Sequence, residues 1–468
     1  MIQLLALALV LPKASGETAE AYKAEPLPVE EFTLDNGMTF LLVPQAAVAN
    51  VAAGWVARVG SADDPPGRSG QSKKLESRIA VLEEDFAATQ QEASTWAFLG
   101  QFSFMYSELG ATGLNANTYP DMTAYFVRIP ATRLEGWFWL ESDRLLDPVF
   151  REFYKEIEIV HEERRIRIDS TPTGALDEEV RRLFWDGHPY AIGPQGLATD
   201  LNQLSRPVAL QFFRREYRPE NLTAVLVGGF DPKQVKAWAK AYFGRLQNQE
   251  VGGTRESTPT IAQPQKATHL FEATCECSPQ IKIHYPSAAF GQPDVYALDV
   301  LAGILNGRTG RLYRDLVLDQ EIAFSAFVQQ QTRRRAGQFS FFAETKGSAS
   351  PHDLLEAWDR EVVRLKSDEA GQQEIARAIN RMSGDAFRSL KDPMDLMSQL
   401  LYYQGLGDWH RVEDWGPGIR QVTAADIQRV AREYLDSKAR TIALYTRADA
   451  KIESAAPTTT ASGRAGSG

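Results

Sequence analysis

The chain has 468 residues, 43% of them hydrophobic and 10% aromatic, which is ordinary for a globular protein and enough for more than one core. A formal net charge of −10, without a basic tract, argues against a nucleic-acid partner. No apolar run reaches the roughly 18 residues that a membrane-spanning helix needs, so we expect no integral membrane segment.

Residues 1–16 contain a short apolar run followed by small residues. This composition resembles a secretory signal segment, although the usual basic residue before the apolar run is missing. We therefore expect a periplasmic or secreted protein, and a buried N-terminal segment is the alternative. The two cysteines, Cys275 and Cys277, lie in an alternating strand pattern, too close for an ordinary disulfide and without the partners of a zinc knuckle. We interpret them as strand residues.

Short strands and amphipathic helices alternate through the first half of the chain. The run FTLDNGMTFLLVP predicts a hairpin whose turn at Asn36 and Gly37 needs a positive φ. Apolar spacing then predicts a strand over 51–59 and helices from Leu75 and from Phe98, followed by a strand that contains Thr123. The first half therefore has an α+β composition.

A charged helix follows Pro148 and ends before Gly174. Glu156 and Glu163 are seven residues apart on it, two turns along one face, so they can share a cation or position one another. The alternative is a solvated face of i,i+4 ion pairs.

The second half of the chain repeats this order of elements. Residues 247–267, rich in Gly, Pro and Thr, predict a linker between a half at 32–246 and a half at 268–447. Arg-Glu-Tyr, a polar turn and a Thr that opens an apolar strand occur in both halves, at 214–227 and at 431–445. This repeat indicates two related halves. The tail at 455–468 has the composition of a disordered segment.

These stretches together resemble the insulinase/pitrilysin family of zinc peptidases, in its bacterial processing-peptidase-like branch. The likeness covers nearly all of 32–447 and rests on FTLDNGMTFLLVP, VARVGSADDPPGRSG, GLNANTYPDMTAYF and FWLESDRLLDPVF followed by KEIEIVHEERRIRID. It implies two related α+β halves, each a mainly antiparallel sheet with helices packed on one face, which close like a clam around a chamber. Zinc is the cofactor that the family uses.

The resemblance also implies roles for individual residues. Glu163 matches the third zinc ligand and Glu156 a carboxylate that supports it. Residues Asn115, Ala116, Asn117 and Thr118 match the edge strand on which family members lay an extended peptide or unfolded polypeptide.

The inverted His-x-x-Glu-His motif, which the family places after a glycine equivalent to Gly70, is missing from the entire sequence. That motif supplies two imidazoles and a general base on one helical face, and a lone Glu163 is too little to hold zinc. His161 cannot substitute, because two residues of spacing put it on another face of the helix. In the second half, Val317 and Phe324 stand where family members often carry an Arg and a Tyr that grip the substrate.

Three hypotheses follow, and whether the chain is an enzyme stays open among them. The first is a catalytically inactive homologue that binds peptides or serves as the non-catalytic partner of a homologous active peptidase in a heterodimer. The second is a zinc metalloendopeptidase whose metal-binding segment is deleted or missing from this version of the sequence. The third is a structural assembly subunit. We favour the first, with no catalytic residue assigned and zinc not bound by this chain.

Overall fold

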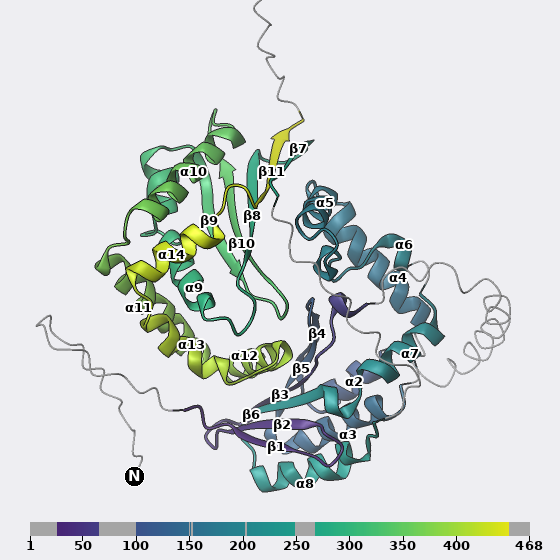
Figure 1. Cartoon of the computed structure of the whole chain (residues 1–468). Coiled ribbons are helices and arrows are strands. Elements are labelled where there is room, and N and C mark those ends of the chain that lie inside the picture. Colours follow the sequence, from purple (N-terminus) through teal and green to yellow (C-terminus); the bar gives the residue numbers. More distant parts are fainter. Residues whose placement is uncertain are drawn as a thin grey trace, which may run out of the picture.

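The computed structural model describes residues 26–64, 100–148, 150, 153–201, 204–248 and 267–448. These residues form two halves, and each half is built around its own sheet (Figure 1). The signal-like segment, the helix expected from Leu75, most of the linker and the tail lie outside the described residues. Within the described ranges, no helix is both long and apolar enough to cross a membrane.

The first sheet has six strands in the order β1-β2-β6-β3-β5-β4, and only the β2–β6 pair is parallel. It begins with the predicted hairpin, in which Thr33 pairs with Thr39 and Gly37 takes a φ of +88°. The strands are β1 (Glu30–Thr33), β2 (Thr39–Pro44), β3 (Asn50–Ala57), β4 (Thr112–Thr118), β5 (Thr123–Pro130) and β6 (Leu222–Gly228).

Helices cover one face of this sheet and build its main core, in which Trp55, Trp137 and Phe138 are buried. Apolar residues that recur at helical spacing explain why α3 and α8 turn one side to the strands. The helices of the first half, not all of which pack on this sheet, are α2 (Gln101–Glu108), α3 (Leu134–Leu146), α4 (Phe153–Arg164), α5 (Gly174–Phe184), α6 (Ala198–Leu201), α7 (Arg206–Glu216) and α8 (Pro232–Tyr242).

The second sheet repeats the topology of the first. Its order is β7-β11-β8-β10-β9 with β7–β11 parallel, which matches β2-β6-β3-β5-β4 strand for strand. The repeated Arg-Glu-Tyr stretches lead from α7 into β6 and from α14 into β11, so the prediction of two related halves is confirmed. The strands are β7 (His269–Cys275), β8 (Gln280–Ser287), β9 (Ala323–Gln331), β10 (Gly337–Thr345) and β11 (Thr441–Arg447).

The helices of the second half also form a core on one face of their sheet. They are α9 (Asp294–Leu305), α10 (Pro351–Ser367), α11 (Gln372–Ser389), α12 (Pro393–Leu406), α13 (Arg411–Arg420) and α14 (Ala424–Tyr434). The sequence did not predict α13, which contains Pro417 between two glycines. Burial of Val412 and Ile419 outweighs its poor helix propensity.

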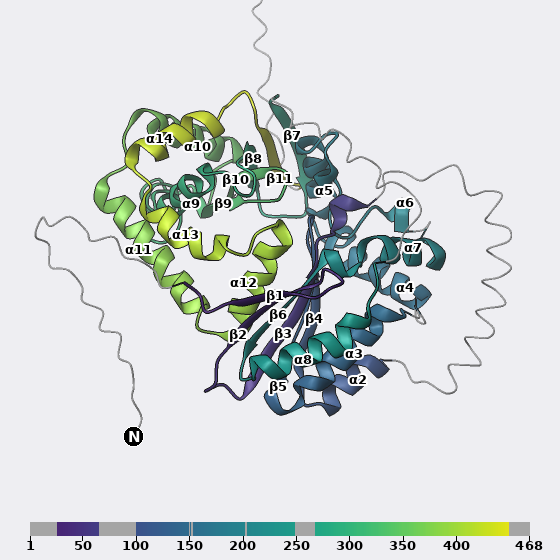
Figure 2. The same ribbon diagram turned by 60° about the horizontal axis from the view of Figure 1, so that its bottom comes forward.

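The two halves exchange one helix each (Figures 1 and 2). Helix α12 packs on the face of the first sheet that the first half's own helices leave open, with Leu400 and Leu401 against Ala52 and Val225. Helix α5, which has the same place in the repeated topology, packs on β7 and β11 through Val180. This reciprocal exchange buries apolar surface between the halves and fixes their relative position.

The interpretation of the cysteines as unpaired strand residues was wrong. Cys275 ends β7 and forms a disulfide with Cys277, which lies after the strand. The strand ends between them, so their side chains no longer point to one face as strict alternation had required.

Candidate functional site

Strand β4 carries all four residues predicted to bind a peptide, and it is the edge strand of the first sheet. Asn115, Ala116, Asn117 and Thr118 are all exposed on it and pair on one side with β5. The opposite side of β4 pairs with no strand among the described residues. An exposed edge of this kind offers backbone donors and acceptors to another extended chain.

A side-chain contact identifies which backbone groups of β4 face that edge. The backbone N–H of Ala116 donates to Asn115 Oδ1 at 2.8 Å rather than to β5. Backbone groups alternate in direction along a strand, so Ala116 and Thr118 present N–H and C=O outward while Asn115 and Asn117 pair with β5. The Asn115 side chain therefore caps a donor that an added strand would use.

Strand β9 is the corresponding edge of the second sheet. Phe324 lies on it with 71% of its surface exposed, whereas Val317 packs against the core of the second half. Both residues stand where the resemblance led us to look for an Arg and a Tyr. Neither side chain can donate a hydrogen bond to a peptide carbonyl.

Helix α4 carries the two predicted carboxylates. Glu156 is exposed, and half-buried Glu163 forms an ion pair with Arg167 at 3.1 Å. Buried Arg164 anchors the helix through a bidentate pair with Glu178 on α5, at 2.6 and 2.8 Å. The helix surface around Glu163 thus has one i,i+4 ion pair and one i,i+3 pair, of the kind offered as the alternative explanation for its charge.

These residues do not fit a zinc ion. Within the described part of the chain, no group of three or more His, Cys, Asp or Glu side chains comes close enough to hold a metal. Glu163 is engaged with Arg167, and His161 lies half-buried on the same helix. The segment that would carry the metal helix falls within residues 65–99, outside the described ranges, and its sequence contains no histidine. The assignment of Glu163 as a zinc ligand and of Glu156 as its supporting carboxylate therefore rests on the family resemblance alone.

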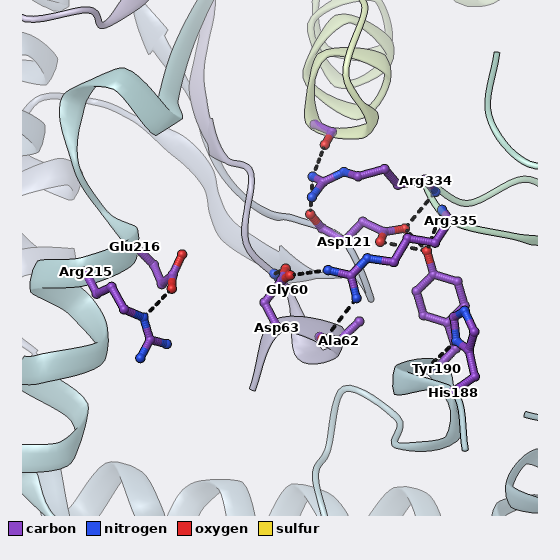
Figure 3. A network of polar contacts seen from close by, with 11 residues as sticks. Gly60, Ala62, Asp63, Asp121, His188, Tyr190, Arg215, Glu216, Arg334 and Arg335 are labelled. Carbon is purple, nitrogen blue, oxygen red and sulfur yellow. Dashed lines mark hydrogen bonds and ion pairs between the residues drawn. The ribbon is translucent and has the colours of Figure 1, made fainter. Parts of the chain in front are cut away.

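A polar network that the sequence did not predict joins the two halves (Figure 3). Arg334, in the turn between β9 and β10, donates its backbone N–H to Asp121 Oδ2 at 3.0 Å and its guanidinium to the Asp121 carbonyl at 2.7 Å. The Tyr190 hydroxyl donates to both carboxylate oxygens of Asp121, at 2.7 and 2.9 Å. Asp121, which follows the edge strand β4, is almost fully buried.

Arg335 extends this network to the short 3-10 helix Ser61–Asp63, which follows β3. Its guanidinium pairs with Asp63 at 2.7 Å, and its backbone N–H donates to the Tyr190 hydroxyl at 3.0 Å. Burial raises the pKa of Asp63, and the nearby Arg335 opposes that rise. The one feature of the sequence that could have indicated this network is the run of three arginines at 333–335 between two predicted strands. Clustered positive charges of this kind attract acidic side chains.

A second buried hydrogen-bond network, centred on His284, lies on the face of the second sheet near α5. His284 Nδ1 is 2.8 Å from Ser340 Oγ and 3.0 Å from Gln338 Nε2, and Gln338 accepts from the Trp185 indole at 3.2 Å. Burial lowers the pKa of His284 to about 4, aided by Lys282. The contact between the halves thus includes, beside the Asp121 network, a buried imidazole whose lowered pKa keeps it neutral near pH 7.

Comparison with known proteins shows similarity to one family of peptidases. Residues 203–382 match the family profile described as the peptidase M16 inactive domain. The chain is 26% identical over 454 residues to the zinc protease PqqE of Helicobacter pylori, covering 94% of this chain and 98% of that protein.

Solved structures share the fold. A protease from Helicobacter pylori aligns with a TM-score of 0.78 and 24% identity, over 90% of this chain and all of that one. The periplasmic protease PqqL from Escherichia coli aligns with a TM-score of 0.70 and 15% identity, over 89% of this chain and 47% of that one. Taken with the profile match and the repeated halves, these findings show that the chain is similar to the insulinase/pitrilysin-like zinc peptidases and is a homologue of them.

Proposed function

We propose that this insulinase-family homologue is catalytically inactive as its sequence stands and binds an extended peptide without cleaving it. The observation that supports this proposal is the lack of a complete set of zinc ligands. Glu163, which matches the third zinc ligand of the family, pairs with Arg167, and the sequence has no His-x-x-Glu-His motif. Zinc-dependent hydrolysis needs about three protein ligands that leave one position open. This donor set does not provide them.

The peptide would add a strand to the first sheet at β4. Ala116 and Thr118 turn their backbone groups to the free edge, and the four exposed side chains of Asn115–Thr118 line it. Main-chain hydrogen bonds give such binding its affinity with little dependence on peptide sequence. We therefore expect weak binding of unfolded polypeptides.

The role that fits this binding is that of a peptide-binding subunit or the non-catalytic partner of an active homologue. A relative of similar length is named a zinc protease, and a structural neighbour aligns with this chain over about half of its own length. A pair of such units is therefore a natural assembly for the family. We propose a periplasmic or secreted location, which the name of that periplasmic neighbour supports.

The test combines metal analysis, a protease assay and calorimetry on the purified chain. We expect less than stoichiometric zinc, no cleavage of an unfolded casein-type substrate, and measurable heat on titration with a disordered peptide. Glu163→Gln is the matched variant, and it should change none of the three. One tightly bound zinc per chain together with cleavage that Glu163→Gln abolishes would overturn the proposal.

The alternative of an active zinc endopeptidase with a missing segment is favoured by one feature. Glu156 and Glu163 keep their seven-residue spacing on α4, although nothing in a peptide-binding subunit requires it. Resequencing the coding DNA around codons 68–75 decides between the two. An uninterrupted reading of the present sequence excludes this alternative.

A structural assembly subunit is the third reading, and it would place the chain in a larger membrane-associated complex. Affinity purification of the chain from its native host distinguishes this reading. Recovery without a stable complex removes it.

A further inference from the structure

A small cavity of about 190 Å³ lies in the second half, apart from β4 and α4. It lies where α9, α12 and α13 meet the end of β9, and these helices lie side by side in Figures 1 and 2. Its volume is below the roughly 300–1,000 Å³ of pockets for drug-sized ligands. It therefore fits a small molecule or a single side chain.

Five of the residues that line this cavity are aromatic. They are Phe290, Tyr296, Tyr402, Tyr403 and Trp415. Gly418 makes room for one of them, because a Cβ there would meet the Tyr296 ring at 2.7 Å. Faces of aromatic rings attract cations, and several rings around one site bind organic ammonium groups.

Two oxygen-bearing side chains complete the lining. Asp299 accepts from the Trp415 indole at 2.8 Å, and it has no ion-pair partner among the described residues. Gln330 Oε1 is buried and has no hydrogen-bond partner in the part of the chain that the structure describes. Burial raises the pKa of Asp299 to about 6, so it is a carboxylate at pH 7.5. Asp299 is half-buried, and a carboxylate held partly out of water without a counter-ion is stabilised when a cation accompanies it.

Arg411 also lines the cavity, but its charge is already balanced. Asp408 and Asp414 lie 3.8 and 3.5 Å from its guanidinium, which also hydrogen-bonds to Tyr296. Arg411 therefore leaves Asp299 without its own counter-ion and gives the cavity little attraction for anions.

We propose that this cavity binds a small organic ammonium cation, with Asp299 as counter-ion and the aromatic rings as its walls. The proposal is independent of peptide binding at β4. A cation bound in the cavity would also affect the contact between the halves through Tyr402. The Tyr402 hydroxyl donates at 3.2 Å to the carbonyl of Thr332, which directly precedes the arginines at 333–335. The Phe290 N–H donates to the carbonyl of Arg333 at 2.9 Å.

The test is calorimetric titration of the full chain at pH 7.5 with choline, its neutral isostere 3,3-dimethylbutanol, and acetate. We expect choline to bind, and to bind at least tenfold more tightly than the neutral isostere. Asp299→Asn should weaken choline binding at least tenfold and leave binding of the isostere unchanged. No choline binding at millimolar concentration, equal affinity for choline and the isostere, or binding of acetate alone would each overturn the proposal.

Glu31→Gln is the matched control. Glu31 accepts from the Trp409 indole at 2.9 Å, as Asp299 does from Trp415, but it does not line the cavity. We expect this variant to bind choline like the parent chain. Loss of choline binding in Glu31→Gln equal to that in Asp299→Asn would refute a specific role for Asp299. The comparison of choline with its isostere on the parent chain decides the question even if Asp299→Asn does not fold.

Discussion

Replacing Ala116 by proline tests strand addition at β4 directly. The Ala116 N–H donates to Asn115 Oδ1 and not to β5, so proline at this position removes an outward donor and leaves the β4–β5 ladder intact. Proline is tolerated in sheets at edge positions whose N–H faces solvent. The substitution should therefore affect the added strand and not the fold.

The size of the effect follows from one lost hydrogen bond. A backbone hydrogen bond contributes a net of about 0.5–1.5 kcal/mol, which corresponds to roughly a 2- to 12-fold change in affinity. A peptide must first displace the Asn115 side chain from this donor, so we expect a value near the lower end, with any clash of the proline ring adding to it. Peptide affinity of Ala116→Pro should fall at least about twofold.

The assay is calorimetric titration with a disordered peptide, with thermal unfolding of each variant as a check on the fold. Ala116→Val is the control, because it adds a side chain of similar bulk and keeps the N–H. If Ala116→Pro and Ala116→Val bind the peptide equally well, the peptide does not pair with β4 at this position. Asn117→Pro should instead destabilise the protein, since its N–H faces β5.

Three further predictions concern the contact between the halves and are read from urea unfolding. Asp121→Ala leaves the Tyr190 hydroxyl and the Arg334 N–H without their acceptor. It should therefore lower the free energy of unfolding by about 2–5 kcal/mol. A loss below about 1 kcal/mol would contradict a stabilising role for the network. His284, with its pKa lowered to about 4, binds a proton in the unfolded state before the native state does, so its contribution to stability is lost as pH falls from about 6.5 to 4. His284→Gln should remove up to about 1.4 kcal/mol per pH unit of that slope, and an unchanged slope would show that the imidazole is not buried. Gly54→Ala puts a Cβ 2.6 Å from a carbonyl of β5 and 2.9 Å from a leucine of α12, and should cost about 1–3 kcal/mol, whereas Gly244→Ala, with open space around it, should not destabilise.

The helix exchange explains why the contact between the halves dominates these predictions. Sheet 1 depends on α12 for one of its two cores, and α12 belongs to the second half of the sequence. The arginine turn and the Tyr190 loop close the same contact with buried hydrogen bonds. Breaking this contact should therefore unfold both halves together rather than separate them.

The sequence by itself determined the local elements, their duplication and the chemistry of the residual site. Alternating and helical spacing are set by neighbouring residues, so the Asn36–Gly37 hairpin was predicted close to where it occurs. The β4 edge was expected from the family resemblance and not from spacing. The missing zinc ligands were also visible, because a helical metal motif is local in sequence.

Only the tertiary structure decided how the halves are joined and which residues line the Asp299 cavity. Asp121 and Arg334 are 213 positions apart, and Asp299 meets Trp415 across 116. No periodicity in a sequence encodes such pairs, because they depend on which faces pack together. The exchange of α5 and α12 and the Asp299 cavity are of this kind, since each depends on packing between elements that are far apart in the sequence.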